Sequence, residues 1–388
     1  MVKCAIVGLG AISGSHVEGY LAQDDRCQII AVSDMKADNI RKTIKQYGLN
    51  VAEYTDYKEM LKDESIDLVS ICTPPGAHKV IAIDCLHAGK HVLLEKPMAP
   101  SLSECDEMIS EASKAKKILS VVAQYRYTGQ YYRLKKLIDS KNAGNILHIA
   151  ADALFWRGQP YYYLDWRGRW ITEGGGCTLN HAVHFIDQLL WLAGMPRRVA
   201  AFMGNAAHDN AEVEDISEAI LQFESGILGR ITSSLLHHGE KQGISIQTEK
   251  GSIGVPFLPR SARTMDNGFP EDDTEQAELL KREFDNVELP VHQGHAGQIQ
   301  DVLSAIEGKE SNYVTGEEGR NALELIQAIY KSAVTQSIVE LPLSKDDTFY
   351  CKETMISQMP IYHEKTVSIS AFQNNTIKVG GGEFVEKR

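Results

Sequence analysis

The sequence predicts an α/β protein with two domains: a parallel sheet wound with helices on both faces, then a domain with an open, mainly antiparallel sheet. Three observations lead to this prediction. The chain has 388 residues, too many for one ordinary hydrophobic core. Strand-like and helix-like segments alternate up to residue 121. From residue 146 onward, β segments follow one another with few helices between them, which is typical of antiparallel sheets.

The alternating segments define the first domain. Apolar, β-rich segments predict strands at residues 2–7, 28–33, 67–72 and 92–94. Helical periodicity follows each of them, at residues 12–22, 36–47, 77–88 and 102–115. Parallel strands need such crossover helices, so these segments indicate one doubly wound sheet. We place the boundary after Gln124, which gives domains of residues 1–124 and 125–388.

The second domain is predicted from longer β segments. A helix at residues 131–140 precedes strands at residues 146–155, 199–203, 216–223, 228–236 and 243–248. One face of their sheet needs a cover, which the late helices at residues 298–307 and 317–337, or a second subunit, would supply. The tail, residues 344–388, has few apolar runs and ends near Gly380-Gly381-Gly382; we expect it to be tied to a partner or to the sheet.

Composition excludes several classes of function. Forty basic and 52 acidic residues give a net charge of −12, which disfavours nucleic acid as a partner. The first residues show no charged leader before a long apolar segment, and no run is long enough to span a bilayer, so we expect a soluble, cytoplasmic protein. The seven cysteines never stand in a CxxC spacing, which argues against a disulfide framework or a zinc knuckle.

A glycine-rich turn joins the first predicted strand to the first predicted helix. Gly8 permits the tight turn, Gly10 allows a pyrophosphate to approach the backbone, and Ser13 is small enough for the helix to pack on the strand. The second strand leads into Asp34, whose carboxylate can accept both ribose hydroxyls. The pattern predicts a Rossmann domain that binds NAD, with NADP disfavoured because Asp34 would repel a 2′-phosphate. Asp34 could also be the N-cap of the next helix.

Two further strand ends point to the same crevice, because doubly wound sheets bind ligands at the carboxyl ends of their strands. Pro74 and Pro75 fix the backbone after the third predicted strand, and His78 follows as either a surface or capping residue or a ligand. The fourth strand runs into Glu95-Lys96-Pro97. Lys96 would lie at a reacting centre; the alternative is a solvated loop lysine.

An aromatic and basic cluster lies in the second domain: Trp156-Arg157, Tyr161-Tyr162-Tyr163 and Trp166-Arg167-Gly168-Arg169-Trp170. Aromatic rings stack on the C–H faces of sugars and guanidinium groups bind hydroxyls. The cluster therefore favours a sugar site or an interface over simple packing.

Three glycines at residues 174–176 precede a predicted helix on which Asn180, His184 and Asp187 stand at i, i+4 and i+7 and share one face. These three residues would serve a site, or be buried and hydrogen-bonded. A metal is not predicted, because asparagine is a poor zinc ligand and His237-His238 would point to opposite faces of a strand.

Together these motifs resemble the Gfo/Idh/MocA oxidoreductases, a family that includes glucose-fructose oxidoreductase and inositol dehydrogenase. The residues that carry the resemblance are Gly8-Leu9-Gly10-Ala11-Ile12 with His16, Thr73-Pro74-Pro75 with His78, Glu95-Lys96-Pro97, and Gly174-Gly175-Gly176 with Asn180, His184 and Asp187. The resemblance implies Lys96 at the nicotinamide, sugar or polyol substrates, and a homodimer or homotetramer that forms through the C-terminal sheet.

We therefore expect hydride transfer between NAD and a ring hydroxyl carbon of a sugar, glycoside or cyclitol. The expected cofactor contacts are Gly8, Gly10, Ala11, Ile12, Asp34, Thr73, Pro74, Pro75, His78, Glu95, Lys96 and Arg167. The expected substrate contacts are Lys96, Arg126, Trp156, Trp166, Asn180 and His184. In catalysis His184 is the expected acid/base and Lys96 binds the reacting oxygen. Asn180, often aspartate in relatives, only orients groups, because an amide cannot accept the proton.

Two other functions fit the same residues. An NAD-dependent glycosidase would oxidise its substrate transiently and release an aglycone, and a non-catalytic protein would bind NAD and a sugar without turnover. Net production of reduced cofactor would separate a dehydrogenase from both.

Overall fold

A computed structural model describes residues 1–370 and residue 372 of the chain. The chain divides into two compact units, one of residues 1–128 with 290–323, the other of residues 129–289 with the chain from 324 onward. This division differs from the boundary after Gln124 predicted from the sequence, chiefly because residues 290–323 return to the first unit. The Gly380-Gly381-Gly382 segment lies outside the described residues.

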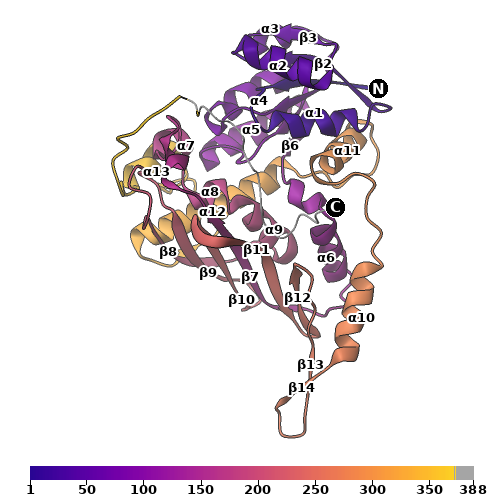
Figure 1. Ribbon diagram of the computed structural model, residues 1–388, viewed down its shortest axis with the longest axis vertical. Coiled ribbons are helices and arrows are strands. Elements are labelled where there is room, and N and C mark those ends of the chain that lie inside the picture. The colour runs from indigo at the N-terminus through magenta and orange to yellow at the C-terminus, as the bar shows by residue number, and fades with distance from the viewer. Residues whose placement is uncertain (371, 373–388) are drawn as a thin grey trace. The chain divides into compact units, whose positions relative to one another are not determined.

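The first unit contains a parallel sheet with the strand order β3-β2-β1-β4-β5-β6 (Figure 1). Its strands are β1 (Val2–Val7), β2 (Cys27–Ser33), β3 (Ala52–Tyr54), β4 (Leu68–Ile71), β5 (His91–Leu94) and β6 (Leu119–Val121). The connecting helices are α1 (Ser13–Leu21), α2 (Ala37–Tyr47), α3 (Tyr57–Met60), α4 (His78–His87) and α5 (Leu102–Ala115). The strand order reverses between β1 and β4, where doubly wound sheets bind ligands, so the predicted Rossmann architecture is confirmed.

Apolar side chains of the central strands fill the core of this unit, because helices cover both faces of a doubly wound sheet. Ile6 of β1 and Leu68 of β4 are fully buried in one cluster with Val17 of α1. α11 (Gly294–Ile306) packs on α1 and adds Ile299 and Val302 to that cluster. The prediction that this helix covers the second sheet is therefore wrong. Helical periodicity shows that a helix has an apolar face, but not which element covers it.

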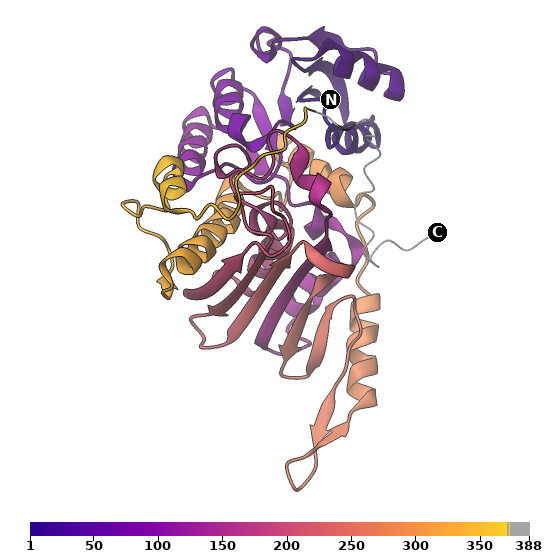
Figure 2. The ribbon, with the colours of Figure 1, turned by 60° about the vertical axis from the view of Figure 1, so that its left-hand side comes forward.

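The second unit is built on one large sheet (Figure 2), whose strands have the order β12-β11-β7-β10-β9-β8-β15. Its strands are β7 (Ile146–Trp156), β8 (Arg198–Gly204), β9 (Ile216–Gln222), β10 (Leu228–Ser234), β11 (Leu236–Thr248), β12 (Gly251–Val255) and β15 (Val339–Glu340). Among the described pairs, β7 and β10 are parallel and the others antiparallel. The predicted mainly antiparallel sheet is confirmed.

Helices and one hairpin complete this unit. They are α6 (Gly129–Asp139), α7 (Trp170–Glu173), α8 (Cys177–Asn180), α9 (Val183–Ala193), α10 (Thr274–Asp285), α13 (Lys352–Gln358) and the hairpin β13 (Ala262–Thr264) and β14 (Pro270–Asp272). α12 (Gly316–Thr335) runs from the first unit into the second. None of the helices formed by the described residues is long and apolar enough to cross a bilayer.

The two faces of the second sheet differ in their cover. On one face Ala219 of β9 is buried where α8 packs, and the Ser332 hydroxyl of α12 accepts a hydrogen bond from the Ala201 N–H of β8 (2.9 Å). α12 thus contributes to the cover, as its periodicity suggested. On the other face Phe202 and Ile220 are 76% and 54% exposed. The predicted open face is therefore present, and it carries large apolar side chains.

Candidate active site

The glycine turn after β1 has the geometry that a dinucleotide requires. Gly8 has a φ of +87°, and a Cβ built on it would lie 2.9 Å from backbone atoms of Cys72, so only glycine fits there. A Cβ on Gly10 would meet nothing within 4 Å, which leaves space for a pyrophosphate beside the backbone. The next helix, α1, starts after Ile12, whose side chain cannot accept a capping hydrogen bond. The helix N-terminus thus suits an anion.

Asp34 lies beside this turn. Its Oδ2 accepts a hydrogen bond from the Leu9 N–H (2.7 Å), and its Oδ1 accepts one from the Lys36 N–H (2.8 Å). Lys36, not Asp34, is the N-cap residue of α2. The carboxylate is therefore held at the mouth of the turn, where a ribose would reach it. Gly8, Gly10 and Asp34 together fit NAD.

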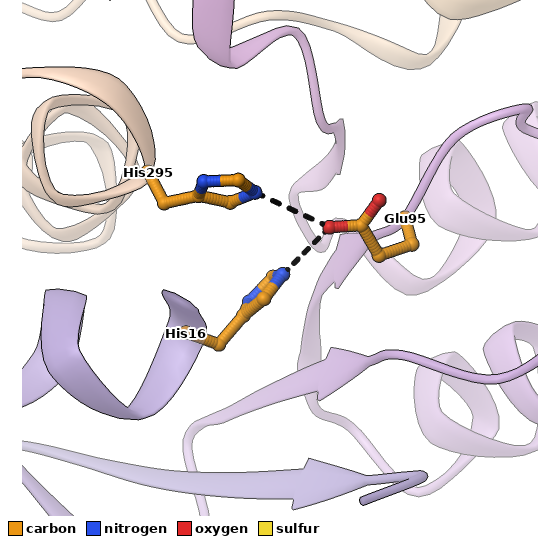
Figure 3. A group of neighbouring side chains, drawn as sticks. All are labelled: His16, Glu95 and His295. Carbon is orange, nitrogen blue, oxygen red and sulfur yellow. Dashed lines mark hydrogen bonds and ion pairs between the residues drawn. The ribbon is translucent and has the colours of Figure 1, made fainter. Parts of the chain in front are cut away.

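A buried cluster of His16, Glu95 and His295, called here the Glu95 triad, connects the cofactor helix to the strand end before Lys96. His16 Nε2 lies 2.9 Å from Glu95 Oε1, and His295 Nε2 lies 3.4 Å from the same oxygen (Figure 3). The three residues come from α1, the end of β5 and α11. His16 is fully buried and Glu95 is 4% exposed, so water competes little for these contacts.

The triad holds Lys96 through the backbone. Glu95 Oε2 accepts a hydrogen bond from the Lys96 N–H (3.1 Å), so the residue before the lysine clamps it with its own side chain. Burial opposes ionisation of Glu95, but hydrogen bonds from His16 and His295 hold its pKa well below the usual range. Burial lowers the pKa of His16. A neutral His16 that donates from Nε2 must accept at Nδ1, which lies 3.1 Å from the Ser70 hydroxyl.

The donor atoms of the Glu95 triad lie within 4.8 Å of one another, so this group could hold a metal ion. A group without a metal is also consistent with the structure, because the carboxylate accepts from His16 Nε2 and lies within ion-pair distance of His295. The group differs from the histidines that sequence analysis weighed around Asn180. The predicted metal independence of the enzyme must therefore be tested against this triad.

Three of the predicted contact residues are bound to other parts of the protein. His78 is fully buried, with Nε2 2.8 Å from the Thr73 carbonyl and Nδ1 3.1 Å from the Pro97 carbonyl, so it joins two loops and is no surface or capping residue. Arg126 is 7% exposed and forms an ion pair with Glu318. Glu95 is committed to the triad and to Lys96. In this structure these three side chains have partners within the protein, and their contacts to cofactor or substrate stay predictions.

The triple-glycine loop of the second unit packs on a buried acid. A Cβ on Gly176 would lie 1.8 Å from the Glu214 carbonyl oxygen, so this position requires glycine. The Glu214 carboxylate accepts hydrogen bonds from the N–H groups of Gly176 (2.9 Å) and Thr178 (3.0 Å). The single helix predicted after this loop is wrong, because α8 ends at Asn180 and α9 begins at Val183.

Asn180 and His184 therefore stand on either side of a break. Asn180 Nδ2 donates to the carbonyls of Gly175 (2.8 Å) and Gly176 (3.2 Å), so its Oδ1 is the atom that would meet a substrate hydroxyl. His184 lies in the first turn of α9 and is partly buried. Asp187, predicted on the same face, is 7% exposed. The amide thus stabilises the loop that precedes the histidine.

The aromatic cluster of the sequence separates into two places. The Arg167 guanidinium lies 4.1 Å from the ring centres of both Tyr161 and Trp166, and Trp166 is 38% exposed. Trp156, predicted to contact the same substrate, instead stacks on His238 with ring centres 5.3 Å apart. Trp156 is the last residue of β7, whereas Tyr161, Trp166 and Arg167 lie in the segment that follows this strand.

Sequence analysis missed Glu173 as a partner of Arg167. Its Oε1 lies 2.9 Å from Arg167 Nη1, and its Oε2 accepts a hydrogen bond from the Gly168 N–H (2.6 Å). Burial raises the pKa of Glu173 to about 7, although Arg167 opposes that shift. Arg167 and Glu173 are six residues apart, and Glu173 directly precedes the glycine loop. This spacing was the one feature of the sequence that could have indicated their ion pair.

A doubly wound sheet with a pyrophosphate turn, a ribose carboxylate and a clamped lysine at a neighbouring strand end defines a nicotinamide-dependent oxidoreductase. Residues 2–123 match the oxidoreductase family with an NAD-binding Rossmann fold, and residues 135–341 match the C-terminal α/β domain of that family. The chain belongs to the Gfo/Idh/MocA oxidoreductases, and its first domain is an NAD-binding domain.

The alignments with individual relatives cover almost the whole length of those relatives. Myo-inositol 2-dehydrogenase of Thermotoga maritima is 26% identical over 88% of this chain and 98% of its own. D-glucoside 3-dehydrogenase of Escherichia coli is 25% identical over 88% of this chain and 97% of its own. The WlbA dehydrogenase of Chromobacterium violaceum, solved with NADH and UDP-GlcNAcA, is 30% identical with a TM-score of 0.76, over 88% of this chain and 96% of its own.

Proposed function

We propose that this protein is an NAD-dependent dehydrogenase that oxidises a ring hydroxyl of a sugar, glycoside or cyclitol. The observation that carries the proposal is the Glu95 triad. It connects α1, the helix that opens at the dinucleotide turn, to the backbone of Lys96. A lysine whose backbone is held at this strand end can present its ammonium group to the oxygen of a reacting carbinol.

Each catalytic residue has a distinct task in this proposal. NAD, when bound, accepts or supplies the hydride. Lys96 binds the reacting oxygen and stabilises developing negative charge on it. His184 takes the hydroxyl proton, since an imidazole titrates near neutral pH. Asn180 positions the substrate through Oδ1 and cannot exchange a proton.

The second unit supports a sugar or cyclitol as the substrate class. The Arg167 guanidinium lies close to the rings of Tyr161 and Trp166, which combines C–H stacking surfaces with hydroxyl donors. The named relatives act on myo-inositol and on a D-glucoside, and the WlbA complex contains a nucleotide sugar. All of these molecules carry ring hydroxyls.

The test is incubation of the purified protein with NAD and a panel of inositols, free sugars, nitrophenyl glycosides and nucleotide sugars. We expect absorbance at the wavelength of reduced cofactor to rise with at least one ring alcohol. Lys96→Met, which keeps most of the side-chain length, is the matched inactive control. Release of nitrophenol without net reduced cofactor would instead establish the glycosidase, and binding without either signal would establish a sugar-binding protein.

We also propose that copies of the chain associate through the open face of the second sheet. Phe202 and Ile220 are large apolar side chains exposed on that face, and such surfaces commonly mark subunit contacts. The double variant Phe202→Lys with Ile220→Lys should have a smaller mass than the parent in light scattering after gel filtration. An unchanged mass would place the interface elsewhere or show that the parent is a monomer.

A further inference from the structure

The chain continues beyond the part that it shares with its relatives. The family match ends at residue 341, and relatives that align over 97–98% of their own length cover 88% of this chain. The described part of this extension contains α13 and then an extended segment, residues 360–369, called here the C-terminal strap. Sequence analysis expected the tail to be tied to the sheet or to a partner.

The strap is instead tied to the loop that carries Trp166 and Arg167. The Ile369 N–H donates to the Tyr163 carbonyl (2.8 Å), and the Asp165 N–H donates to the Ile369 carbonyl (2.9 Å). At the other end of the strap, the Pro360 carbonyl accepts from Trp170 Nε1 (2.8 Å). The strap therefore holds the loop on both sides of Arg167.

Asn210 joins the strap to the loop, and both the oxygen and the nitrogen of its side-chain amide form hydrogen bonds. Its Oδ1 accepts from the N–H groups of Thr366 and Val367 (both 2.8 Å), and its Nδ2 donates to the carbonyls of Tyr162 (3.0 Å) and Val367 (2.9 Å). Asn210 is 3% exposed, so water does not compete for these bonds. A buried amide with both ends satisfied fixes the register of strap and loop.

The strap does little for the hydrophobic core. None of residues 361–370 is buried, and Ile361 and Val367 are 64% and 41% exposed. Removal of such a segment costs little apolar burial, so the rest of the unit should fold without it. The hydrogen bonds of the strap run to the loop around Arg167 and to residues 203–212, and Asn210 of that second segment also binds the loop, so the strap has a task at that loop.

We propose that the C-terminal strap sets the position of Trp166 and Arg167 and thereby determines the affinity for the substrate. This proposal rests on the proposed function, because it assigns these two side chains to the sugar. Asn210 is then a positioning residue, which acts on the substrate through the loop. The strap lies outside the family match, which ends at residue 341.

The experiment compares three proteins with the parent. A stop after Met359 removes the strap, and a stop after Ser370 keeps all of it as the matched control. Asn210→Asp is isosteric and still accepts from Thr366 and Val367, but it places an oxygen against the Tyr162 and Val367 carbonyls. The readouts are KM and kcat for the sugar, NADH affinity by fluorescence, and the rate at which trypsin cleaves after Arg167 and Arg169.

Loss of the strap should raise KM about tenfold or more while kcat changes less than about threefold, because positioning of bound substrate weakens and the proton-transfer groups remain. Cleavage after Arg167 and Arg169 should accelerate, and NADH affinity should stay unchanged. Asn210→Asp should shift KM and cleavage in the same direction, and the stop after Ser370 should match the parent.

Unchanged cleavage would show that the strap does not hold the loop, and faster cleavage with an unchanged KM would show that the loop does not determine affinity. Either result overturns the proposal. A parent that turns over no ring alcohol refutes the proposed function and the assignment to the sugar, while cleavage still decides whether the strap holds the loop. If the protein truncated after Met359 does not fold, Asn210→Asp supplies the same readouts.

Discussion

Glu173 should make the stability of this protein fall as the pH rises through neutrality. Its pKa is about 7 in the folded chain, against an ordinary value of 4.5, because burial penalises the carboxylate. Between pH 4.5 and 7 the folded state keeps a proton that the unfolded state has released. Protons bound preferentially by the folded state stabilise it at low pH, so this contribution is complete below pH 4.5 and disappears above pH 7.

The size of the effect follows from the shift. One pKa unit corresponds to 1.36 kcal/mol, so a rise from 4.5 to about 7 corresponds to about 3 kcal/mol. The Glu173 side chain is 1% exposed, so solvent screening does not reduce this figure much. Glu173→Gln removes the ionisable group, although its amide nitrogen cannot accept one of the two hydrogen bonds that Glu173 accepts from Arg167 and Gly168. The variant therefore has no group at residue 173 that gains or loses a proton. Its stability at a single pH can differ from that of the parent, but the pH dependence due to Glu173 should be absent.

The assay is urea unfolding of parent and variant at pH 5, 6, 7 and 8. The parent should lose about 3 kcal/mol more between pH 5 and 8 than Glu173→Gln does. Glu224→Gln removes the same charge from a side chain that is 82% exposed, and it should follow the parent. If Glu173→Gln and the parent have the same slope against pH, Glu173 titrates in its ordinary range and the argument from burial fails.

Five further predictions concern catalysis and cofactor. Because the Asp34 carboxylate faces the ribose position, kcat/KM should be higher with NAD than with NADP, and the opposite order would show that Asp34 does not read the ribose. Dialysis against a chelator should leave activity unchanged, since Lys96 supplies the positive charge; activity that zinc restores would assign a metal to the Glu95 triad. Lys96→Met should lower kcat about a hundredfold or more with NAD binding retained, and His184→Asn should lower kcat by roughly two to four decades and flatten the acidic limb of the pH–rate profile. Asn180→Ala should mainly raise KM. If His184→Asn keeps the pH profile of the parent, the general base is Lys96 in its neutral form and not His184.

Sequence patterns predict which residues form the helices and strands of this protein better than they predict which of these elements pack against one another. The helix predicted at residues 102–115 is α5 at both ends, because Leu102, Cys105 and Met108 form a clear buried stripe. β3 was missed, since Ala52-Glu53-Tyr54 is a short polar edge strand. The break between α8 and α9 has no glycine or proline at His181 and Ala182 to announce it.

The site was predicted where chemistry follows from local sequence. Gly8, Gly10 and Asp34 have fixed spacings in a strand–turn–helix unit, and the structure brings them together at one turn. The pairing of Glu95 with His295 depends on where α11 packs, and no local pattern encodes a contact across two hundred residues of chain. Buried roles such as that of His78 were misjudged for the same reason: burial depends on elements far away in the sequence.

The NAD-binding unit cannot be completed while the ribosome is still making the middle of the chain, because α11 belongs to it. Gln298 of α11 accepts a hydrogen bond from the Ala123 N–H (2.9 Å) and donates one to the Val121 carbonyl (2.7 Å), at the last strand of that sheet. Synthesis at roughly 5–20 residues per second puts about 10 to 40 s between the end of the first segment and the arrival of residues 290–323. During that interval α1 and β6 lack their partner. A gene fragment that ends at residue 128 would therefore encode an unfinished domain, and a version with residues 290–323 grafted on is the shortest unit expected to bind NAD by itself.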